Sequence, residues 1–180
     1  MAVLLLIGVV VVRGRILSLQ SAAAGIWSGL DALLQRRHDL IRPLVEIVQR
    51  HAPREGRLVD KVLAARKRAT AAHAPPAIGR AEGVLGVEVQ ALFERAETLP
   101  DLGSRAEFRR IKAQFEDMGR RIAAAQGTYN AAARSYNTAR LGLPGALLSL
   151  LIRLEPLEYY GGADAATTER ASGAAEPMGL

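Results

Sequence analysis

The chain has 180 residues, a length that suits one domain, and 49% of them are hydrophobic, which is enough to build a core. It contains no cysteine, so disulfides and thiolate-bound metal sites are excluded. The formal net charge of +6 comes mainly from arginine, and this excess fits either a binding surface or a coding bias toward arginine and alanine.

The chain begins with an apolar run of twelve residues. As a helix it covers about 18 Å, whereas the hydrocarbon core of a bilayer is about 30 Å thick. A signal peptide fits poorly, because no basic residue precedes the run and no small-residue cleavage site follows it. A buried soluble helix fits poorly too, because every face is apolar. We therefore predict a membrane anchor over residues 1–15, extended by snorkelling arginines or by a start site farther upstream. Its apolar members are Leu4, Leu5, Leu6, Ile7, Val9, Val10, Val11 and Val12.

Positive charge lies only on the C-terminal side of this anchor, at Arg13, Arg15, Arg36 and Arg37. The positive-inside rule then places the rest of the chain in the cytoplasm. Because only two of these arginines are close to the membrane, a periplasmic location stays open.

A long helix is expected after the anchor, from about Ile16 to Arg50. Pro43 should kink this helix rather than end it, because the apolar spacing continues beyond it. Its heptad core is interrupted only by Arg37. The core positions are Ile16, Leu19, Ala23, Ile26, Leu30, Leu33, Leu40, Leu44 and Ile47.

A second helix is expected to begin near Pro53 and to end at Ala74, before Pro75-Pro76. A third helix follows. If the two prolines only kink the chain, these helices form one rod and the fold is a three-helix bundle. If the chain turns back there, four helices run up and down. The expected core of the second helix is Leu58, Val62, Ala65 and Ala69, and that of the third is Ile78, Ala81, Leu85, Val89, Leu92, Ala96 and Leu99.

The fourth helix has the most regular heptad pattern in the chain, typical of a coiled coil. Pro100–Gly103 should form a turn, and Ser104 with Glu107 a capping box that opens the helix. Large side chains recur every seven residues at Phe108, Phe115, Ile122, Tyr129 and Tyr136, with Ile111, Met118, Ala125, Ala132 and Ala139 between them.

These elements predict an all-α fold in which a membrane helix is followed by an antiparallel up-and-down four-helix bundle with long outer helices, over residues 16–141. That topology returns the last helix toward the membrane. Residues 142–160 are apolar enough to rest at the membrane interface, with Arg153, Tyr159 and Tyr160 at headgroup level. Residues 161–180 have the composition of a disordered tail.

The sequence offers no pattern typical of catalysis, and we expect neither a metal nor a cofactor. The three histidines never take a metal-ligand spacing. Gly79, Gly83 and Gly86 lack the lysine of a phosphate loop, so we expect them to allow close helix approach. The arginine clusters are interleaved with acids and few aromatics, which favours a solvated helix face over a nucleic-acid groove. Acidic lipid headgroups are the better candidate partner.

Arg37 is the charged break in the first helical stripe. A core arginine needs an acidic partner, since its desolvation would otherwise cost several kcal/mol. We interpret it as a register-fixing buried pair rather than a ligand-binding charge. The candidate partners are Glu88, Glu94, Glu107 and Glu116.

Several short segments occur in a characteristic order: Trp27 and Asp31, Arg36-Arg37-His38-Asp39, Pro100 and Asp101, Tyr129-Asn130, Tyr136-Asn137 and Pro144-Gly145. Together these segments resemble the LemA family. The resemblance spans about residues 1–160 and implies a bacterial membrane protein with one N-terminal span and an antiparallel four-helix domain. The family has no established enzymatic activity, and its relatives include a magnetosome-membrane protein.

We therefore expect a non-enzymatic, single-pass scaffold of the bacterial inner membrane that docks other membrane proteins through its helices. Membrane lipids are the second class of partner, and self-association stays open. The alternative is a peripheral binder of anionic lipid or nucleic acid that acts through the arginine clusters, and its binding should weaken steeply with salt.

Overall fold

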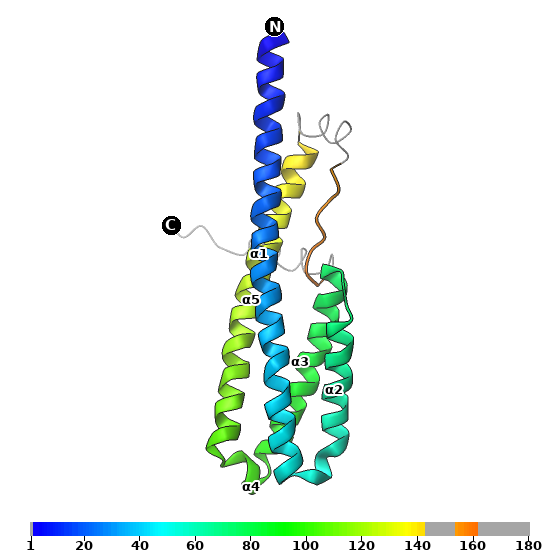
Figure 1. Cartoon of the computed structure of the whole chain (residues 1–180), viewed down its shortest axis with the longest axis vertical. Coiled ribbons are helices and arrows are strands. Elements are labelled where there is room, and N and C mark those ends of the chain that lie inside the picture. Colours follow the sequence, from blue (N-terminus) through cyan, green and yellow to red (C-terminus); the bar gives the residue numbers. More distant parts are fainter. Residues whose placement is uncertain (1, 143–153, 162–180) are drawn as a thin grey trace, which may run out of the picture.

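The computed structural model describes residues 2–142 and 154–161, with side chains from Gly8 onward. All secondary-structure elements in this part of the chain are helical (Figure 1). The expectations for residues 143–153 and 162–180, and for the side chains of Leu4 to Ile7, lie outside the described residues. The elements are α1 (Ala2–His51), the 3-10 turn η1 (Pro53–Glu55), α2 (Gly56–Thr70), α3 (Pro75–Glu97), α4 (Pro100–Gly103) and α5 (Ala106–Leu141).

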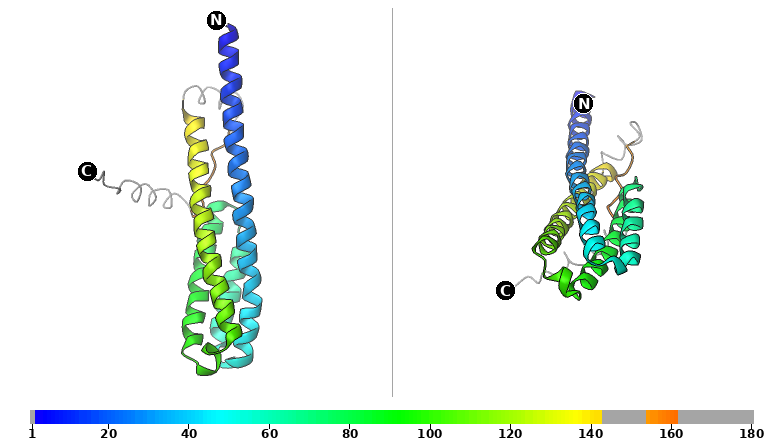
Figure 2. Two further views of the ribbon diagram at one scale, coloured as in Figure 1. Left: turned by 90° about the vertical axis from the view of Figure 1, so that its left-hand side faces the viewer. Right: turned by 60° about the horizontal axis from the view of Figure 1, so that its bottom comes forward.

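The apolar N-terminal run and the first long helix form one continuous helix, α1. It has 50 residues and contains Pro43, so the expectation that this proline does not end the helix is confirmed. Leu44 is fully buried directly after the proline, and packing on both sides holds the helix together there. At about 1.5 Å per residue α1 is about 75 Å long, and its N-terminal end projects beyond the rest of the molecule (Figures 1 and 2).

Helices α1 and α5 lie alongside each other over most of the length of α5 (Figure 2). The large residues of the predicted α5 stripe, from Phe108 to Tyr136, are buried. One position is wrong: Ala133 is fully buried, whereas Ala132 is only partly covered. The stripe itself does not shift, since Tyr136 is also fully buried; Ala133 is buried because it packs in one cluster with Tyr129 and Tyr160.

Helices α2 and α3 pack against each other as an antiparallel hairpin, so the collinear rod is excluded. α2 ends at Thr70, four residues before the predicted end, and α3 starts on Pro75 itself. Ala74 has an extended backbone (φ −106°, ψ 143°), as expected for a residue that precedes proline. A proline is tolerated in the first helical turn because its missing N–H would have no partner there.

The start of α5 differs from the prediction. The expected turn at Pro100–Gly103 is the one-turn helix α4, and no side chain caps α5. The Ser104 hydroxyl instead donates a hydrogen bond to the carbonyl of Pro100 (2.7 Å). The predicted capping box is therefore wrong, because α4 already engages the serine.

Among the described residues, the buried side chains form three clusters along the long axis. The largest is at the lower end of Figure 1, where all the helices meet around Leu44, Val62, Leu92 and Phe108. Above it, the middle cluster joins α1, α5 and the start of α3 to residues 154–161. The uppermost cluster surrounds Ile16 and Tyr136 and includes the partly buried Val9 and Val12. The C-terminal end of α5 therefore reaches the level of the apolar run.

Candidate functional site

The most organised polar site in the described structure holds residues 154–161, here called the strap. The strap runs in extended form along α5 toward the start of α3 (Figure 1). Its last described residue approaches α3 closely, since a Cβ atom on Gly79 would lie 2.6 Å from the Cα of Gly161. Gly161 itself has a φ of 83°, a left-handed conformation that glycine adopts without strain. Glycines at both positions thus allow the strap to approach α3 closely.

Two asparagines on α5 bind the strap backbone in the same way. The Asn137 side chain accepts a hydrogen bond from the Leu157 amide (2.9 Å) and donates one to its carbonyl (2.8 Å). Asn130 accepts from the Tyr160 amide (2.9 Å) and donates to the Tyr160 carbonyl (3.4 Å). Each asparagine therefore satisfies both backbone groups of one strap residue.

The two tyrosines that precede these asparagines add a second set of bonds. The hydroxyl of Tyr136 donates to the carbonyl of Glu155 (3.0 Å), and that of Tyr129 donates to the carbonyl of Glu158 (2.8 Å). Burial raises the pKa of both phenols, which keeps the donating proton in place. We call these four α5 residues the Tyr-Asn ladder.

The spacing of the Tyr-Asn ladder follows from backbone geometry. Its two Tyr-Asn pairs are seven residues apart, which is about 10.5 Å along a helix. The strap residues that each type of side chain binds are three apart, which is about 10 Å along an extended chain. A heptad repeat on α5 therefore matches every third residue of the strap.

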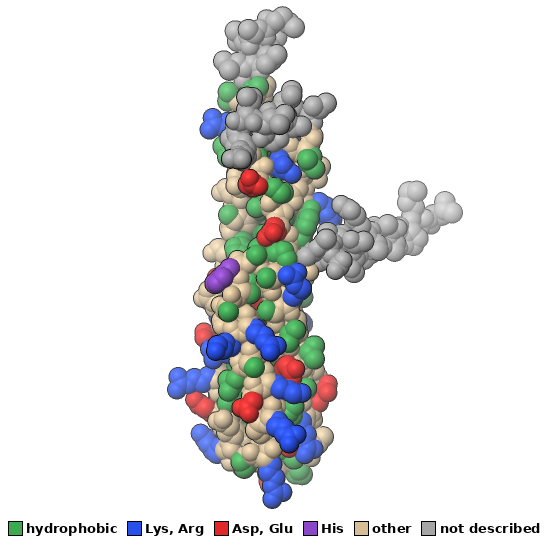
Figure 3. Space-filling model, turned by 90° about the vertical axis from the view of Figure 1, so that its right-hand side faces the viewer, with side chains coloured by type: hydrophobic (Ala, Val, Ile, Leu, Met, Phe, Trp, Pro, Cys, Tyr) green, Lys and Arg blue, Asp and Glu red, His purple; other side chains and the backbone are tan. Residues whose placement is uncertain are grey.

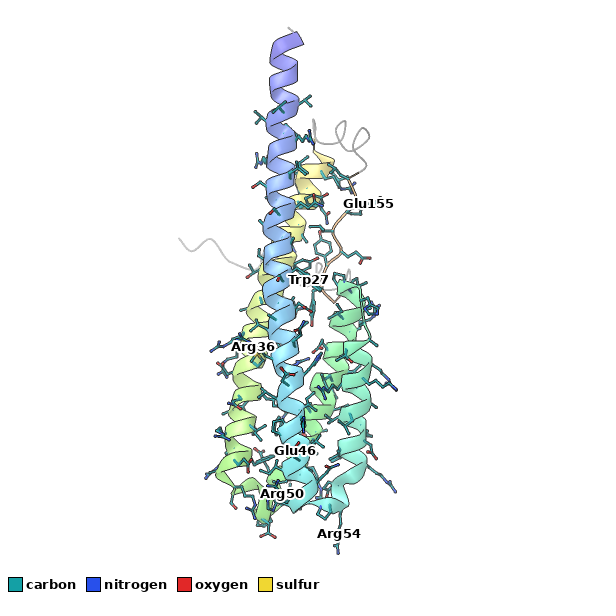
Figure 4. The ribbon with its side chains drawn as sticks, viewed as in Figure 1. Trp27, Arg36, Glu46, Arg50, Arg54 and Glu155 are labelled. Atoms are coloured by element: carbon teal, nitrogen blue, oxygen red, sulfur yellow. The ribbon has the colours of Figure 1, made fainter. Side chains whose placement is uncertain are left out.

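Aromatic packing closes the lower end of this site. The Trp27 ring of α1 lies 5.0 Å from the Tyr129 ring and 6.4 Å from the Tyr160 ring, measured between centroids. Figure 4 shows Trp27 on the side of α1 along which the strap passes. Tyr160 is 4% exposed, so its expected position at headgroup level is wrong, and Tyr159 is also partly covered by protein.

A second polar feature is the buried charge cluster of Arg37, His38 and Glu82. Arg37 and His38 are neighbours on α1, and each contacts one carboxylate oxygen of Glu82 on α3. His38 Nε2 lies 2.5 Å from Glu82 Oε1, and Arg37 Nη2 also donates to the Glu82 backbone carbonyl (3.1 Å). One buried carboxylate thus anchors α3 to α1.

Burial sets the electrostatics of this charge cluster. Desolvation lowers the pKa of Arg37, although a guanidinium still keeps its charge. Burial also lowers the pKa of His38, and the positive charges of Arg37 and Arg66 lower it further. The Glu82 carboxylate is already paired with Arg37, so we assign His38 as the neutral donor to its second oxygen.

The expectation that Arg37 is a paired core charge is confirmed, but all four proposed partners are wrong. Glu116 faces Lys112 (3.7 Å), and Glu94 accepts a hydrogen bond from Gln90 (2.9 Å). Glu82 was missed because it lies in the glycine-rich segment that starts α3. Gly83 and Gly86 there do not serve close helix packing, since a Cβ at either position would meet no heavy atom within 4 Å.

The other residues that carry the family resemblance in the sequence lie nearer the surface. Asp31 is partly buried and accepts a hydrogen bond from Gln35 (2.7 Å). Pro100 and Asp101 are exposed at the start of α4. Arg36 and Asp39 are exposed and line an open groove of 590 Å³ between α1 and α5.

This groove is not a concentrated anion site. Its Asp117 pairs with Arg121 (2.7 Å) and with the nearby Arg120 (3.2 Å). On the face in Figure 3, basic and acidic side chains also intermingle over the lower part of the molecule. Across residues 2–142 and 154–161, no group of three or more histidine or acidic side chains is placed to hold a metal ion.

Comparison with the sequence profiles of protein families shows which family this chain belongs to. The sequence profile of the LemA family matches residues 26–172, which is most of the chain. The chain belongs to the LemA family. The matched segment of this LemA-family protein contains both the Tyr-Asn ladder and the buried charge cluster, whereas the apolar run precedes it. No curated protein matches the chain.

Proposed function

We propose that this LemA-family protein is a single-pass scaffold of the bacterial inner membrane without catalytic activity. In this proposal its helices form an antiparallel four-helix bundle that docks other membrane proteins. The observation that carries the proposal is the continuity of α1, because one helix joins an exposed apolar end to the folded domain. From Ile16 to His51 that helix extends about 50 Å, so it would hold the domain at a fixed height above the bilayer.

The exposure of the N-terminal part of α1 supports membrane anchoring. An 18-residue window near this end has a mean hydropathy of 1.3, and only 11% of it is buried in the protein. A core helix of a soluble protein would be mostly buried. Val10 and Val11 are 62% and 63% exposed, which would be costly in water and favourable in lipid.

Fractionation of cells tests the anchor. The full chain should stay in the membrane fraction after an alkaline wash, because its apolar run is held by lipid rather than by charge. A chain that begins at Ile16 should be soluble and serves as the matched control. Recovery of the full chain in the supernatant would defeat the proposal. Cysteine labelling from either side would test the cytoplasmic placement that the charge bias favours.

The salt dependence of binding tests how the protein docks its partners. Protein docking through apolar helix faces should persist between about 50 and 200 mM salt, whereas binding of anionic lipid or nucleic acid through arginines should weaken steeply. Exposed hydrophobic side chains on the α2–α3 hairpin support protein docking: Leu63, Val84 and Val87 are 39%, 46% and 68% exposed. Pairing of Arg120 and Arg121 with Asp117 argues against the electrostatic alternative.

A further inference from the structure

We propose that the surface lined by the Tyr-Asn ladder is a binding site for an extended peptide segment, which the chain's own strap occupies in cis. The ligand would be a polypeptide with an apolar residue three positions before a Tyr-Gly pair, in the pattern of Leu157, Tyr160 and Gly161. This inference concerns a different surface from the proposed scaffold faces and does not require membrane anchoring.

The first argument is that the hydrogen bonds of the Tyr-Asn ladder reach only the backbone of its occupant. Its four side chains donate four hydrogen bonds to strap carbonyls and accept two from strap amides. Main-chain hydrogen bonds give affinity for an extended segment whatever its side chains are, while pockets for a few side chains give specificity. The site therefore has the chemistry of peptide recognition.

The second argument is that the strap side chains divide into packed and exposed ones. Tyr160 is buried, and Leu154, Leu157 and Tyr159 are partly buried against the core clusters, whereas Glu155, Pro156 and Glu158 are exposed. An occupant needs to match the packed positions and the glycine that lies against Gly79. The three exposed positions of a ligand are free to vary.

The third argument is that the strap can leave without breaking a helix. It contributes no helical residue, and it packs on α1, α5 and the start of α3 from outside. The asparagine and tyrosine groups that it covers are polar, so water can satisfy them when the strap departs. A peptide in trans would replace the same bonds one for one.

The test uses the full chain with Leu157→Asp and Tyr160→Ser, which weaken the strap and leave the Tyr-Asn ladder intact. The probe is a fluorescein-labelled synthetic peptide with the sequence of residues 154–161, and binding is followed by fluorescence anisotropy. We call this double variant the released variant. The peptide should bind it, and its affinity for the wild-type chain should be at least about tenfold lower. The reason is that the tethered strap competes at a high effective concentration, on the order of millimolar.

Backbone recognition is tested by modified peptides. N-methylation at the Leu157 position removes the amide hydrogen that Asn137 accepts, and should weaken binding roughly tenfold. N-methylation at the Glu158 position is the matched control, because the Tyr-Asn ladder does not bind that amide. In the released variant, Asn137→Leu should also abolish binding, whereas Ser135→Ala, at an exposed position of the same helix, should not.

Two results would overturn the proposal. One is a folded released variant, judged by circular dichroism, that fails to bind the unmodified peptide. The other is equal weakening by both N-methylations, which would mean adsorption through side chains. If the released variant does not fold, the wild-type chain decides the question: excess peptide should speed hydrogen exchange at the Leu157 and Tyr160 amides, and unchanged exchange would refute the proposal.

Discussion

The lower and upper parts of this molecule complete their cores in different ways. In the lower part, the α2–α3 hairpin covers α1 and α5 with interlocking apolar side chains such as Val62, Leu85 and Leu92. In the upper part the hairpin has ended, and the strap covers the α1–α5 pair through backbone hydrogen bonds to the Tyr-Asn ladder.

Because of this difference, global unfolding and local opening of the strap should depend on different parts of the molecule. Apolar packing is lost only when the helices themselves separate, since its free energy comes from the area removed from water. Hydrogen bonds to a non-helical segment are each worth about 1 kcal/mol net, and water replaces them when the segment leaves. The lower part should therefore govern global unfolding, and the upper part should open locally.

The largest expected effect is at the buried charge cluster, where the two parts meet. Arg37→Ala would leave the Glu82 carboxylate without its cation and should cost about 3–5 kcal/mol. Thermal unfolding of the full chain in detergent measures the loss. Replacing Arg37 and Glu82 together by leucine should restore much of the stability, whereas the exposed neighbour Arg36→Ala should shift it by less than about 0.5 kcal/mol. An unchanged midpoint for Arg37→Ala would mean that the cluster is not built as described.

The next largest effect should come from the lower core. Leu92→Ala empties a fully buried site between the helices and should cost about 2–5 kcal/mol of global stability. Leu63→Ala removes the same atoms from a side chain that is 39% exposed, and should cost far less. Denaturant unfolding monitored by circular dichroism compares them, and equal losses would contradict the assignment of α2 and α3 to this core.

The heptad pattern predicted the helices, and the proline pair marked the hairpin. Periodicity reports which face of a helix is apolar, so it found Leu44, Leu92 and Phe108 directly. The partner of Arg37 depends instead on the axial position of α3 against α1, which spacing along one helix does not contain. The sequence therefore suggested four glutamates, and none of them is the partner, which is Glu82.

The strap was missed for a different reason. An extended segment of eight residues has no helical period, and its aromatic residues suggested a membrane interface. The available signal was on α5, where Asn130 and Asn137 lie seven apart beside core tyrosines. A buried amide needs hydrogen-bond partners, and a helix interior has none to spare. One buried and one partly buried amide, seven residues apart on one side of the helix, predict that another backbone passes there.

In the upper part, Asn130→Ala should act locally. The substitution removes both bonds to Tyr160 and should speed hydrogen exchange at the Tyr160 amide, while protection of core amides such as that of Leu92 stays the same. Its cost should be about 1–3 kcal/mol, confined to opening of the strap. Ser135→Ala on the same helix is the control. Loss of protection throughout the molecule would show that the strap and the lower core unfold together.

The smallest effect should be a pH dependence at His38. Burial and then the charges of Arg37 and Arg66 lower the pKa of His38 below its ordinary value of 6.5, while Asp39 and Asp31 oppose the shift weakly and Glu82 faces the ring. The unfolded chain therefore binds a proton at higher pH than the fold does. The contribution of neutral His38 to the stability of the fold is complete above pH 6.5 and is lost as the pH falls through the lowered pKa of His38. His38→Gln keeps a donor for Glu82 and should show a shallower loss of thermal stability on acidification, whereas the exposed His73→Gln should follow the wild type. Stability that rises on acidification would instead mean that Glu82 holds His38 in its protonated form.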